Sequence, residues 1–469
     1  MRWLTRYLFL PIYFLLPVVL LAADWPTYRG DARRSGGDGK PGPASPKILW
    51  SLPTKEHFLA APVATAERVY VSGLGFANTP SFYALDTALQ AKNRIAWAKT
   101  VPVLTLPTVS SPALVGETLY FGEGMHQTNG ASVYALHRTR GVLLWEYRLE
   151  GELVHLEGGP TLAGGKLFLG GGAAGVVCLD PAKLTLQGKA LSPEAIAKAI
   201  EAKRAELQKK YEQAKANNDP FALPPSERDL PRATPALVWQ AGKERWHVDA
   251  PVAVIGESVL VASAFLDKEK VGSRALYCLD AATGKEKWMN PLPLNPWGGP
   301  SVEGDLVVVT GSSIFYDPEA LKGAKGFVAA FELATGKPRW KKDLPAAALA
   351  CASLTKDTAI VPCSDGKVRA YTLAKGALRW TADVGAPLFA PAALDDETVY
   401  LADLAGGVHA LNLKTGVARW KLDVAGELKS PGMFYAGPVL REGRLYVASC
   451  NVVGKHAGKP TFVACIGSK

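Results

Sequence analysis

The stretch LDAATGKEKW, residues 279–288, decides the fold because it recurs along the chain. Close copies read FELATGKPRW at 331–340 and LNLKTGVARW at 411–420, and looser copies end at Trp145 and Trp380. In all five copies a Gly lies four residues before the Trp, and a polar or charged side chain lies eight residues before it. Those polar side chains are His137, Asp280, Glu332, Thr372 and Asn412. Fixed internal spacing over five copies indicates a structural repeat.

Each copy reads as a β-hairpin. It follows a strand-like run such as residues 275–278 and opens another such as residues 287–289. The polar residue starts the turn, the Gly takes the position that needs a positive φ, and the Trp begins the return strand.

The Trp residues that begin return strands recur at intervals of 40 to 52 residues, with one gap of 94 residues between Trp145 and Trp239. Small residue–Pro pairs run in step and open the next strand, so that each period holds four strands. Four-stranded units of this length predict an all-β fold, an eight-bladed β-propeller. We expect these tryptophans to pack between blades as structural residues. They are Trp50, Trp97, Trp145, Trp239, Trp288, Trp340, Trp380 and Trp420.

The last blade lacks an outer strand within its own period, because the chain stops after the strand-like run 461–466. We expect the early strand-like segment 47–52 to supply it. That pairing would close the ring and leave no open sheet edge between the first and last blades. The propeller is therefore predicted to span residues 47–469.

The long gap indicates an insertion in the third blade, residues 181–235. Ser192 followed by Pro193 is typical of a helix start. The run from Ala195 to Ala216 is rich in helix formers and has apolar residues at helical spacing. We predict a helical arm, either docked on the propeller or protruding from it. A role in binding a partner is the functional alternative.

The N-terminus has the pattern of a secretory signal, residues 1–23: Arg2 and Arg6 precede an apolar run that ends in small residues. An exported protein of the periplasm or cell envelope is expected. An uncleaved segment that holds the chain at the membrane is the alternative. Residues 24–46 are predicted to form an extended lead-in, anchored by Trp25 and Tyr28.

Composition excludes one class of partner. The formal charge is +10, but it is scattered and forms no basic cluster interleaved with aromatic residues, so we expect no nucleic-acid binding. The six cysteines show no CxxC motif. Cys351 and Cys363 lie on neighbouring predicted strands, and an oxidising compartment leaves a bridge between them open. We expect a monomer.

The repeat resembles that of the PQQ-like (pyrroloquinoline-quinone-like) β-propeller family, whose recurring motif, Ala-x-Asp-x-x-Thr-Gly-x-x-x-Trp, is matched best at residues 278–288. The lead-in DWPTYRG at 24–30 also looks like the segment that precedes such propellers in exported bacterial proteins. The resemblance implies two functions. Some members are quinoprotein dehydrogenases that hold PQQ and calcium on the propeller axis. Others are envelope scaffolds without a cofactor, such as outer-membrane assembly factors of the BamB type.

This chain departs from both patterns. It has neither the vicinal cysteine pair nor the CxxCH motif that the resemblance associates with the enzymes, and no lipidation cysteine near the signal. A cofactor is therefore not expected, and PQQ with calcium remains the alternative.

Candidate ligand-binding residues lie in the segments that connect the outer strand of one blade to the inner strand of the next, since these segments meet at one mouth of a propeller channel. Plugging the channel is the structural alternative for them. His155 with Glu157, and His247 with Asp249, alternate by two and so face one side of an extended segment. Two such pairs could hold a metal, but we predict none. The candidates are His57, His155, Glu157, His247, Asp249, Trp297, Phe389 and Tyr435.

The sequence thus favours an exported, non-catalytic binding or scaffolding module of the cell envelope, with envelope proteins or polymers as partners. No catalytic residues are predicted. A PQQ-dependent oxidoreductase of alcohols or sugars is the first alternative. A propeller that binds carbohydrate or peptide through its aromatic residues is the second.

Overall fold

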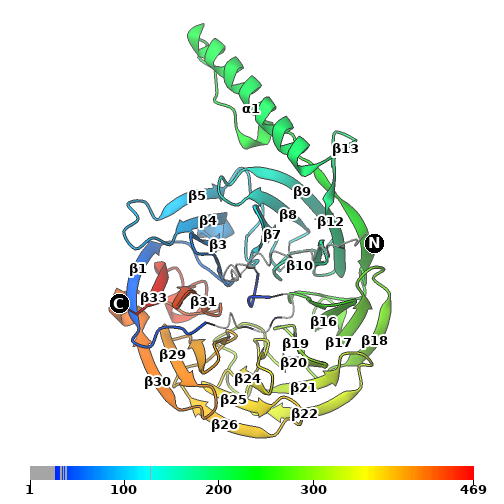
Figure 1. Ribbon diagram of the computed structural model, residues 1–469, viewed down its shortest axis with the longest axis vertical. Coiled ribbons are helices and arrows are strands. Elements are labelled where there is room, and N and C mark those ends of the chain that lie inside the picture. Colours follow the sequence, from blue (N-terminus) through cyan, green and yellow to red (C-terminus); the bar gives the residue numbers. More distant parts are fainter. Residues whose placement is uncertain (1–26, 32–33, 35, 37–39, 127, 469) are drawn as a thin grey trace, which may run out of the picture.

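The computed structural model is a ring of eight antiparallel sheets around a central axis (Figure 1). It describes residues 27–31, 34, 36, 40–126 and 128–468. The predicted signal segment therefore lies outside the described residues, as does Trp25. The eight-bladed, four-stranded propeller predicted from the sequence is confirmed.

The first four blades follow one another along the chain, and each runs from its inner strand to its outer strand. The third carries an additional short strand, β13, on the extended part of β12. Their strands are β2 (Val63–Ala64), β3 (Arg68–Leu74), β4 (Pro80–Asp86), β5 (Ile95–Thr100); β6 (Ala113–Val115), β7 (Thr118–Glu123), β8 (Gly130–His137), β9 (Leu143–Glu150); β10 (Thr161–Ala163), β11 (Lys166–Gly170), β12 (Val176–Leu186), β13 (Lys189–Leu191), β14 (Thr234–Ala241); β15 (Ala253–Ile255), β16 (Ser258–Leu266), β17 (Val271–Asp280) and β18 (Glu286–Pro291).

The next three blades are regular, and the eighth has three strands from the end of the chain. Their strands are β19 (Pro300–Glu303), β20 (Leu306–Ser312), β21 (Gly326–Glu332), β22 (Pro338–Leu344); β23 (Ser353–Leu354), β24 (Thr358–Pro362), β25 (Lys367–Thr372), β26 (Leu378–Asp383); β27 (Ala393–Leu394), β28 (Thr398–Ala402), β29 (Gly407–Asn412), β30 (Ala418–Asp423); β31 (Val439–Arg441), β32 (Arg444–Ala448) and β33 (Thr461–Gly467). Short helical elements are η1 (Phe76–Asn78), η2 (Glu227–Asp229), η3 (Gly454–His456) and α2 (Val424–Leu428).

The ring closes through β1 (Lys47–Thr54), which pairs antiparallel with β33 and completes the eighth blade. Trp50 lies opposite Cys465 in this pairing. The first described strand of the chain thus lies beside the last one, as the sequence predicts, and no outer edge is left where the ring closes.

Burial follows from the stacking of blades. Middle strands such as β24 are buried at every position, because both of their faces are covered by neighbouring blades. Outer strands such as β5 alternate between half-buried and exposed residues. Each hydrophobic cluster draws on adjacent blades: Ile360 of β24 and Val399 of β28 belong to one of them. The core is therefore a series of contacts between blades.

The repeated Gly and Trp bind adjacent blades to one another. Trp380 donates from Nε1 to the carbonyl of Leu413 in the next blade, at 3.0 Å. Its ring lies against Gly416 in the turn of that blade, where a Cβ would come within 2.5 Å of Trp380 Cε3. Both a positive φ of 73° and this close approach therefore require Gly at 416. The same pairing joins Trp97 to Gly141, Trp239 to Gly284, Trp288 to Gly336 and Trp340 to Gly376.

Substitution at Gly416 should separate these two requirements. Gly385 also has a positive φ, 88°, but open space where its Cβ would lie. We expect Gly385→Ala to cost about 1–2 kcal/mol of stability for its backbone conformation. Gly416→Ala should cost a further ~1–3 kcal/mol because the methyl group overlaps the Trp380 ring. Chemical denaturation of both variants checks this, and equal losses would contradict the packing argument.

Three of the eight tryptophans lack this pairing. Trp145 faces the third blade, where the insertion interrupts the hairpin, and forms a bridge with Ala233 instead. The ring of Trp50 has no turn glycine above it and is covered by Arg94, whose Cζ lies 4.3 Å from the ring centroid. Trp420 faces the closure of the ring, and its Nε1 donates to the carbonyl of Pro43 at 2.9 Å. The lead-in thus takes the place of a blade turn where the ring closes.

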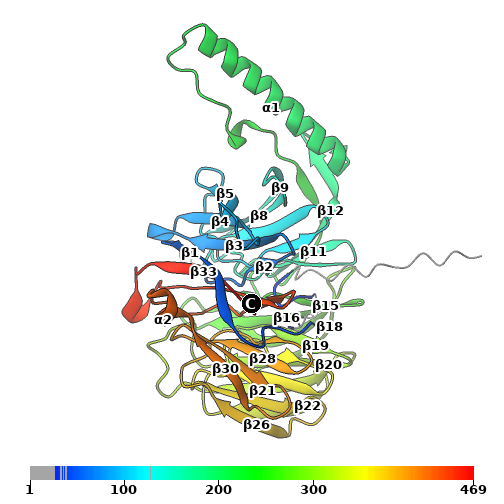
Figure 2. The same ribbon diagram turned by 60° about the vertical axis from the view of Figure 1, so that its left-hand side comes forward.

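The insertion carries the one long helix of the described chain, α1 (Pro193–Ala216), with Ser192 as its N-cap. The helix projects away from the propeller rim (Figures 1 and 2). Only Ile196 and Ile200 of α1 are buried, so its base is docked and the rest protrudes. β12 continues beyond Pro181 to Leu186, later than the predicted start of the insertion. Its ladder with β14 shifts register between Asp180 and Leu184, where Pro181 cannot donate a hydrogen bond.

None of the helices in the described residues is long and apolar enough to cross a membrane. The six cysteines are buried and free, so the bridge left open between Cys351 and Cys363 is not formed. Burial raises the pKa of Cys363 to about 12, and its thiol stays protonated at neutral pH.

Candidate functional site

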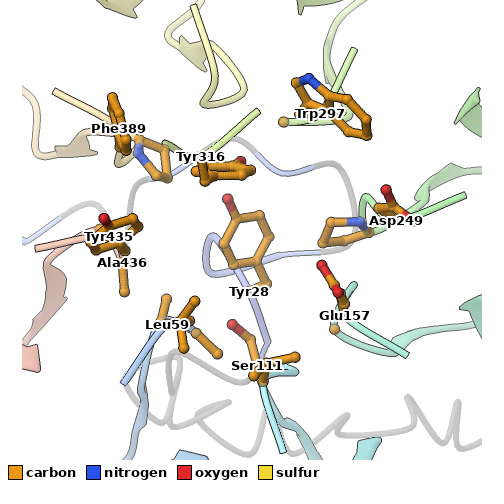
Figure 3. A pocket seen from close by; sticks show the side chains of 18 of the residues that line it. Tyr28, Leu59, Ser111, Glu157, Asp249, Trp297, Tyr316, Phe389, Tyr435 and Ala436 are labelled. Carbon is orange, nitrogen blue, oxygen red and sulfur yellow. The ribbon is translucent and has the colours of Figure 1, made fainter. Parts of the chain in front are cut away.

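A cavity of about 360 Å³ lies on the propeller axis (Figure 3). Most of its wall is formed by the segments that connect the outer strand of one blade to the inner strand of the next. Loops between the second and third strands of a blade contribute further residues. The first group supplies, among others, Leu59, Ser111, Glu157, Asp249, Trp297, Phe389 and Tyr435. The second supplies Met125, His126, Phe315 and Tyr316.

The lead-in places a side chain inside this cavity. Tyr28 stands in the middle of it, surrounded by Leu59, Tyr316 and Tyr435 (Figure 3). Its hydroxyl lies 3.8 Å from Cys351 Sγ in the sixth blade. Burial raises the pKa of Tyr28 well above its ordinary value, so it stays a neutral phenol. The chain therefore places its own side chain on the axis, and the cavity is the space that remains around it.

Two buried arginines hold the lead-in in place. Arg29 donates to Ser353 Oγ at 2.7 Å and to the carbonyl of Ala392 at 3.1 Å. Arg34 is fully buried and donates to the carbonyls of Val252, at 3.2 Å, and Tyr28, at 2.5 Å. It also donates to Thr161 Oγ1. Burial lowers the pKa of Arg34 to about 10, so the guanidinium remains charged at neutral pH. Together they tie the lead-in to four blades.

Three imidazoles and two carboxylates gather in one part of the cavity wall. His155 and His247 are fully buried, and their Nε2 atoms are 3.3 Å apart. Asp249 Oδ1 lies 3.2 Å from the first of these nitrogens and 2.9 Å from the second. His126 completes a group of three histidines whose ligand atoms lie within 4.8 Å of one another. Glu157 accepts a hydrogen bond from the His126 backbone.

The charges in this cluster influence one another. Burial disfavours the protonated form of His155, but the carboxylates of Asp249 and Glu157 outweigh it, and the pKa of His155 is raised. Burial favours neutral Asp249, but the neighbouring His247 and His155 outweigh it and lower the pKa of Asp249. The carboxylate of Asp249 is therefore ionised at neutral pH.

Aromatic rings cover the other side of the cavity. Trp297 packs edge-on against Phe315 at 4.8 Å between ring centroids, and Phe389 packs edge-on against Tyr435 at 5.6 Å. Trp297 Nε1 and the Tyr435 hydroxyl are buried and have no hydrogen-bond partner among the described residues. A ligand with acceptor groups would satisfy both.

The structure brings together most of the candidates predicted from the sequence. Five of them line the cavity: Glu157, Asp249, Trp297, Phe389 and Tyr435. His155 and His247 lie directly behind its wall, against Asp249. His57 does not join them: its Nδ1 accepts from the backbone N–H of Asn451 at 3.0 Å, and burial lowers its pKa. His57 therefore has a structural role, because it accepts a hydrogen bond from a backbone N–H group of a loop.

Sequence reasoning missed Tyr28 as a lining residue, together with His126, Phe315 and Tyr316. The last three lie in the loops between second and third strands, on the face already assigned to the site. A search of those loops for aromatic and histidine side chains would have found them. Tyr28 was predicted only to anchor the lead-in, because no sequence signal places an extended segment across the axis.

The fold and the recurring Gly–Trp contacts define a PQQ-like β-propeller. The chain belongs to the family described as outer membrane protein assembly factor BamB, whose model matches residues 42–193, 228–388 and 364–459. A curated relative is the quinohemoprotein alcohol dehydrogenase ADH IIB of Pseudomonas putida, 34% identical over 112 residues. That match covers 22% of this chain and 16% of the relative's length.

Solved structures from both functional classes share the fold. BamB from Moraxella catarrhalis superposes with a TM-score of 0.57 at 14% identity, over 90% of this chain and 97% of that one. The quinohemoprotein alcohol dehydrogenase ADHIIG from Pseudomonas putida HK5 has a TM-score of 0.61 at 12% identity, over 95% of this chain and 80% of that one. At these identities the likeness extends to the fold alone.

The lining of the axial cavity lacks the charged groups that PQQ alone would need. This quinone is a flat tricarboxylate and needs cationic partners for its carboxylates. Among the described residues that line the cavity there is no Lys or Arg, whereas Glu157 and Asp249 are both acidic. Tyr28 also stands in the middle of the lining residues (Figure 3) and reduces the space for a flat ring system. Trp297 could stack on such a ring, but the two carboxylates would repel those of the quinone unless a cation such as calcium lay between them.

Proposed function

We propose that this protein is an exported, non-catalytic binding module of the cell envelope. One observation carries the proposal: the axial cavity has an acidic and aromatic lining and holds Tyr28 of the chain's own lead-in at its centre. A catalytic propeller needs this space for its cofactor and substrate. Here the space serves to join the lead-in to the blades.

Three further features support the proposal. The matching family model is described as an outer membrane assembly factor. The N-terminal sequence has the pattern of an export signal. In the segment after α1, the side chains of Phe221 and Leu223 are 86% and 81% exposed, so that little of their apolar surface is buried within the chain. A protruding arm with such residues suits the binding of envelope proteins or polymers.

Titration with PQQ and calcium tests the non-catalytic part of the proposal. Trp297 lines the cavity, so a flat quinone bound there would quench its fluorescence. We expect no saturable quenching of the wild-type protein at high micromolar quinone. A quinoprotein dehydrogenase stripped of its cofactor serves as the positive control.

Two variants sharpen this titration. Tyr28→Ala empties the centre of the cavity, and binding that appears only in this variant would identify Tyr28 as the group that excludes the quinone. Saturable quenching of the wild type, lost in Trp297→Phe, would overturn the proposal. It would favour the second candidate, a PQQ-dependent oxidoreductase, which the 34% identity to ADH IIB supports.

A further inference from the structure

The histidine cluster in the cavity wall has the composition and spacing of a metal centre. We propose that His155, His247 and Asp249, with His126 as the fourth ligand, bind a divalent first-row transition ion, and that zinc is the ion they fit best. From the sequence alone, no metal is expected at these residues. The inference does not depend on the binding function proposed above.

The distances between ligand atoms carry the inference. Asp249 Oδ1 and the Nε2 atoms of His155 and His247 form a triangle with sides of 2.9, 3.2 and 3.3 Å. Ligands of a tetrahedral zinc ion, bound at ~2.0–2.1 Å, lie about 3.3 Å from one another. A single ion slightly above the plane of the triangle therefore reaches all three atoms at bonding distance.

Protons alone do not account for this triangle. Both oxygens of Asp249 are buried, and Oδ1 faces two imidazole nitrogens at 2.9 and 3.2 Å. The two imidazole nitrogens are themselves only 3.3 Å apart. One proton joins one pair of atoms, whereas one cation joins all three. Three buried polar atoms this close together are therefore explained by one shared cation.

The ligand types select the metal. Imidazole nitrogen favours zinc and its first-row neighbours, whereas calcium and magnesium prefer oxygen ligands. Two histidines and one carboxylate form the close triangle, and His126, whose ligand atom lies within 4.8 Å of those of the two histidines, would move inward to complete a tetrahedral zinc site. Glu157 Oε1 lies 3.5 Å from His155 Nδ1, in the place of the carboxylate that often orients a metal-bound histidine. Its negative charge and that of Asp249 would balance a divalent ion.

The ligands are held by rigid backbone. His155 and Glu157 precede β10, and His247 and Asp249 precede β15, so adjacent blades each supply one alternating pair. Gly172 exchanges backbone hydrogen bonds of 3.0 Å with Val248. A Cβ at Gly172 would come within 2.4 Å of the His155 ring, which therefore rests directly on that turn. His247 N donates to Ser263 Oγ at 3.0 Å. Three ligands on rigid backbone, His155, His247 and Asp249, reduce the cost of ordering the site when an ion binds.

His126 approaches from the cavity side. Its ring stands nearly perpendicular to those of His155 and His247, with centroids at 5.6 and 5.7 Å. Because His126 and Asp249 line the cavity, the ion would be reached from the axis.

The test uses untagged full-length protein, stripped with a chelator and then dialysed with zinc. We expect one equivalent of zinc per chain by mass spectrometry of the metal. His247→Gln should weaken binding by about 100-fold or more, in line with the loss of a metal ligand. His456→Gln, the same change outside the cluster, is the matched control and should retain full binding.

Cobalt substitution gives a second measurement that needs no variant. The stripped wild-type protein should develop the intense visible absorption bands of tetrahedral cobalt, and one equivalent of zinc should abolish them. Zinc retention equal in wild type and a folded His247→Gln variant, or the absence of cobalt bands in the wild type, would overturn the inference.

Discussion

Replacing Trp380 with Ala is expected to lower the free energy of unfolding by about 3–5 kcal/mol, the range for large aromatic truncations in a core. Trp380 is only 8% exposed and packs in a cluster formed by the sixth and seventh blades. The truncation leaves a cavity against Gly416 and takes the donor from the Leu413 carbonyl. Both losses fall on the contact that joins the two blades, so their separation should become easier.

Chemical denaturation followed by circular dichroism measures this change. Val417→Ala is the control, because Val417 lies in the same hairpin turn but is 64% exposed. It should change stability by less than about 0.5 kcal/mol. A Trp380→Ala denaturation curve that coincides with that of the wild type would show that the repeated Trp does not hold the blades together.

Replacing Arg34 with Met should cost about 3 kcal/mol or more, since each buried acceptor left without its donor costs ~1–3 kcal/mol. The carbonyl of Tyr28 and the hydroxyl of Thr27 lose their Arg34 donor, whereas the carbonyl of Val252 keeps a hydrogen bond from Thr161 Oγ1 at 2.8 Å. Met fills part of the volume but offers no hydrogen bonds. The lead-in should then leave the axis and take Tyr28 with it.

Denaturation gives the stability change, and limited proteolysis gives its location. We expect early cleavage before Lys47 in Arg34→Met, while the eight blades stay resistant. Arg339→Met is the matched control: Arg339 pairs with Glu332 at 2.9 Å, but its side chain is 47% exposed. Such surface pairs contribute about 0–1 kcal/mol. Equal behaviour of the two variants would mean that the buried arginine does not anchor the lead-in.

The candidate site was only partly accessible to sequence reasoning. Alternation by two correctly grouped His155 with Glu157 and His247 with Asp249. His57, in the same kind of segment, lies apart from them and accepts a hydrogen bond from the Asn451 backbone. The role of His57 depends on which residue of another segment it contacts, and the pattern within its own segment does not contain that information.

The sequence by itself determined the number of blades, the order of their strands and the closure by β1. These features depend on local periodicity, which is visible in residues 279–288 and their copies. It also determined that Gly takes a positive φ in each turn. Only the tertiary structure decided that the ring of Trp380 rests on Gly416 of the next blade, that Tyr28 lies on the axis, and that the two pairs from adjacent blades meet. Those contacts join segments far apart in the chain, and the curvature of the closed ring decides which of them touch.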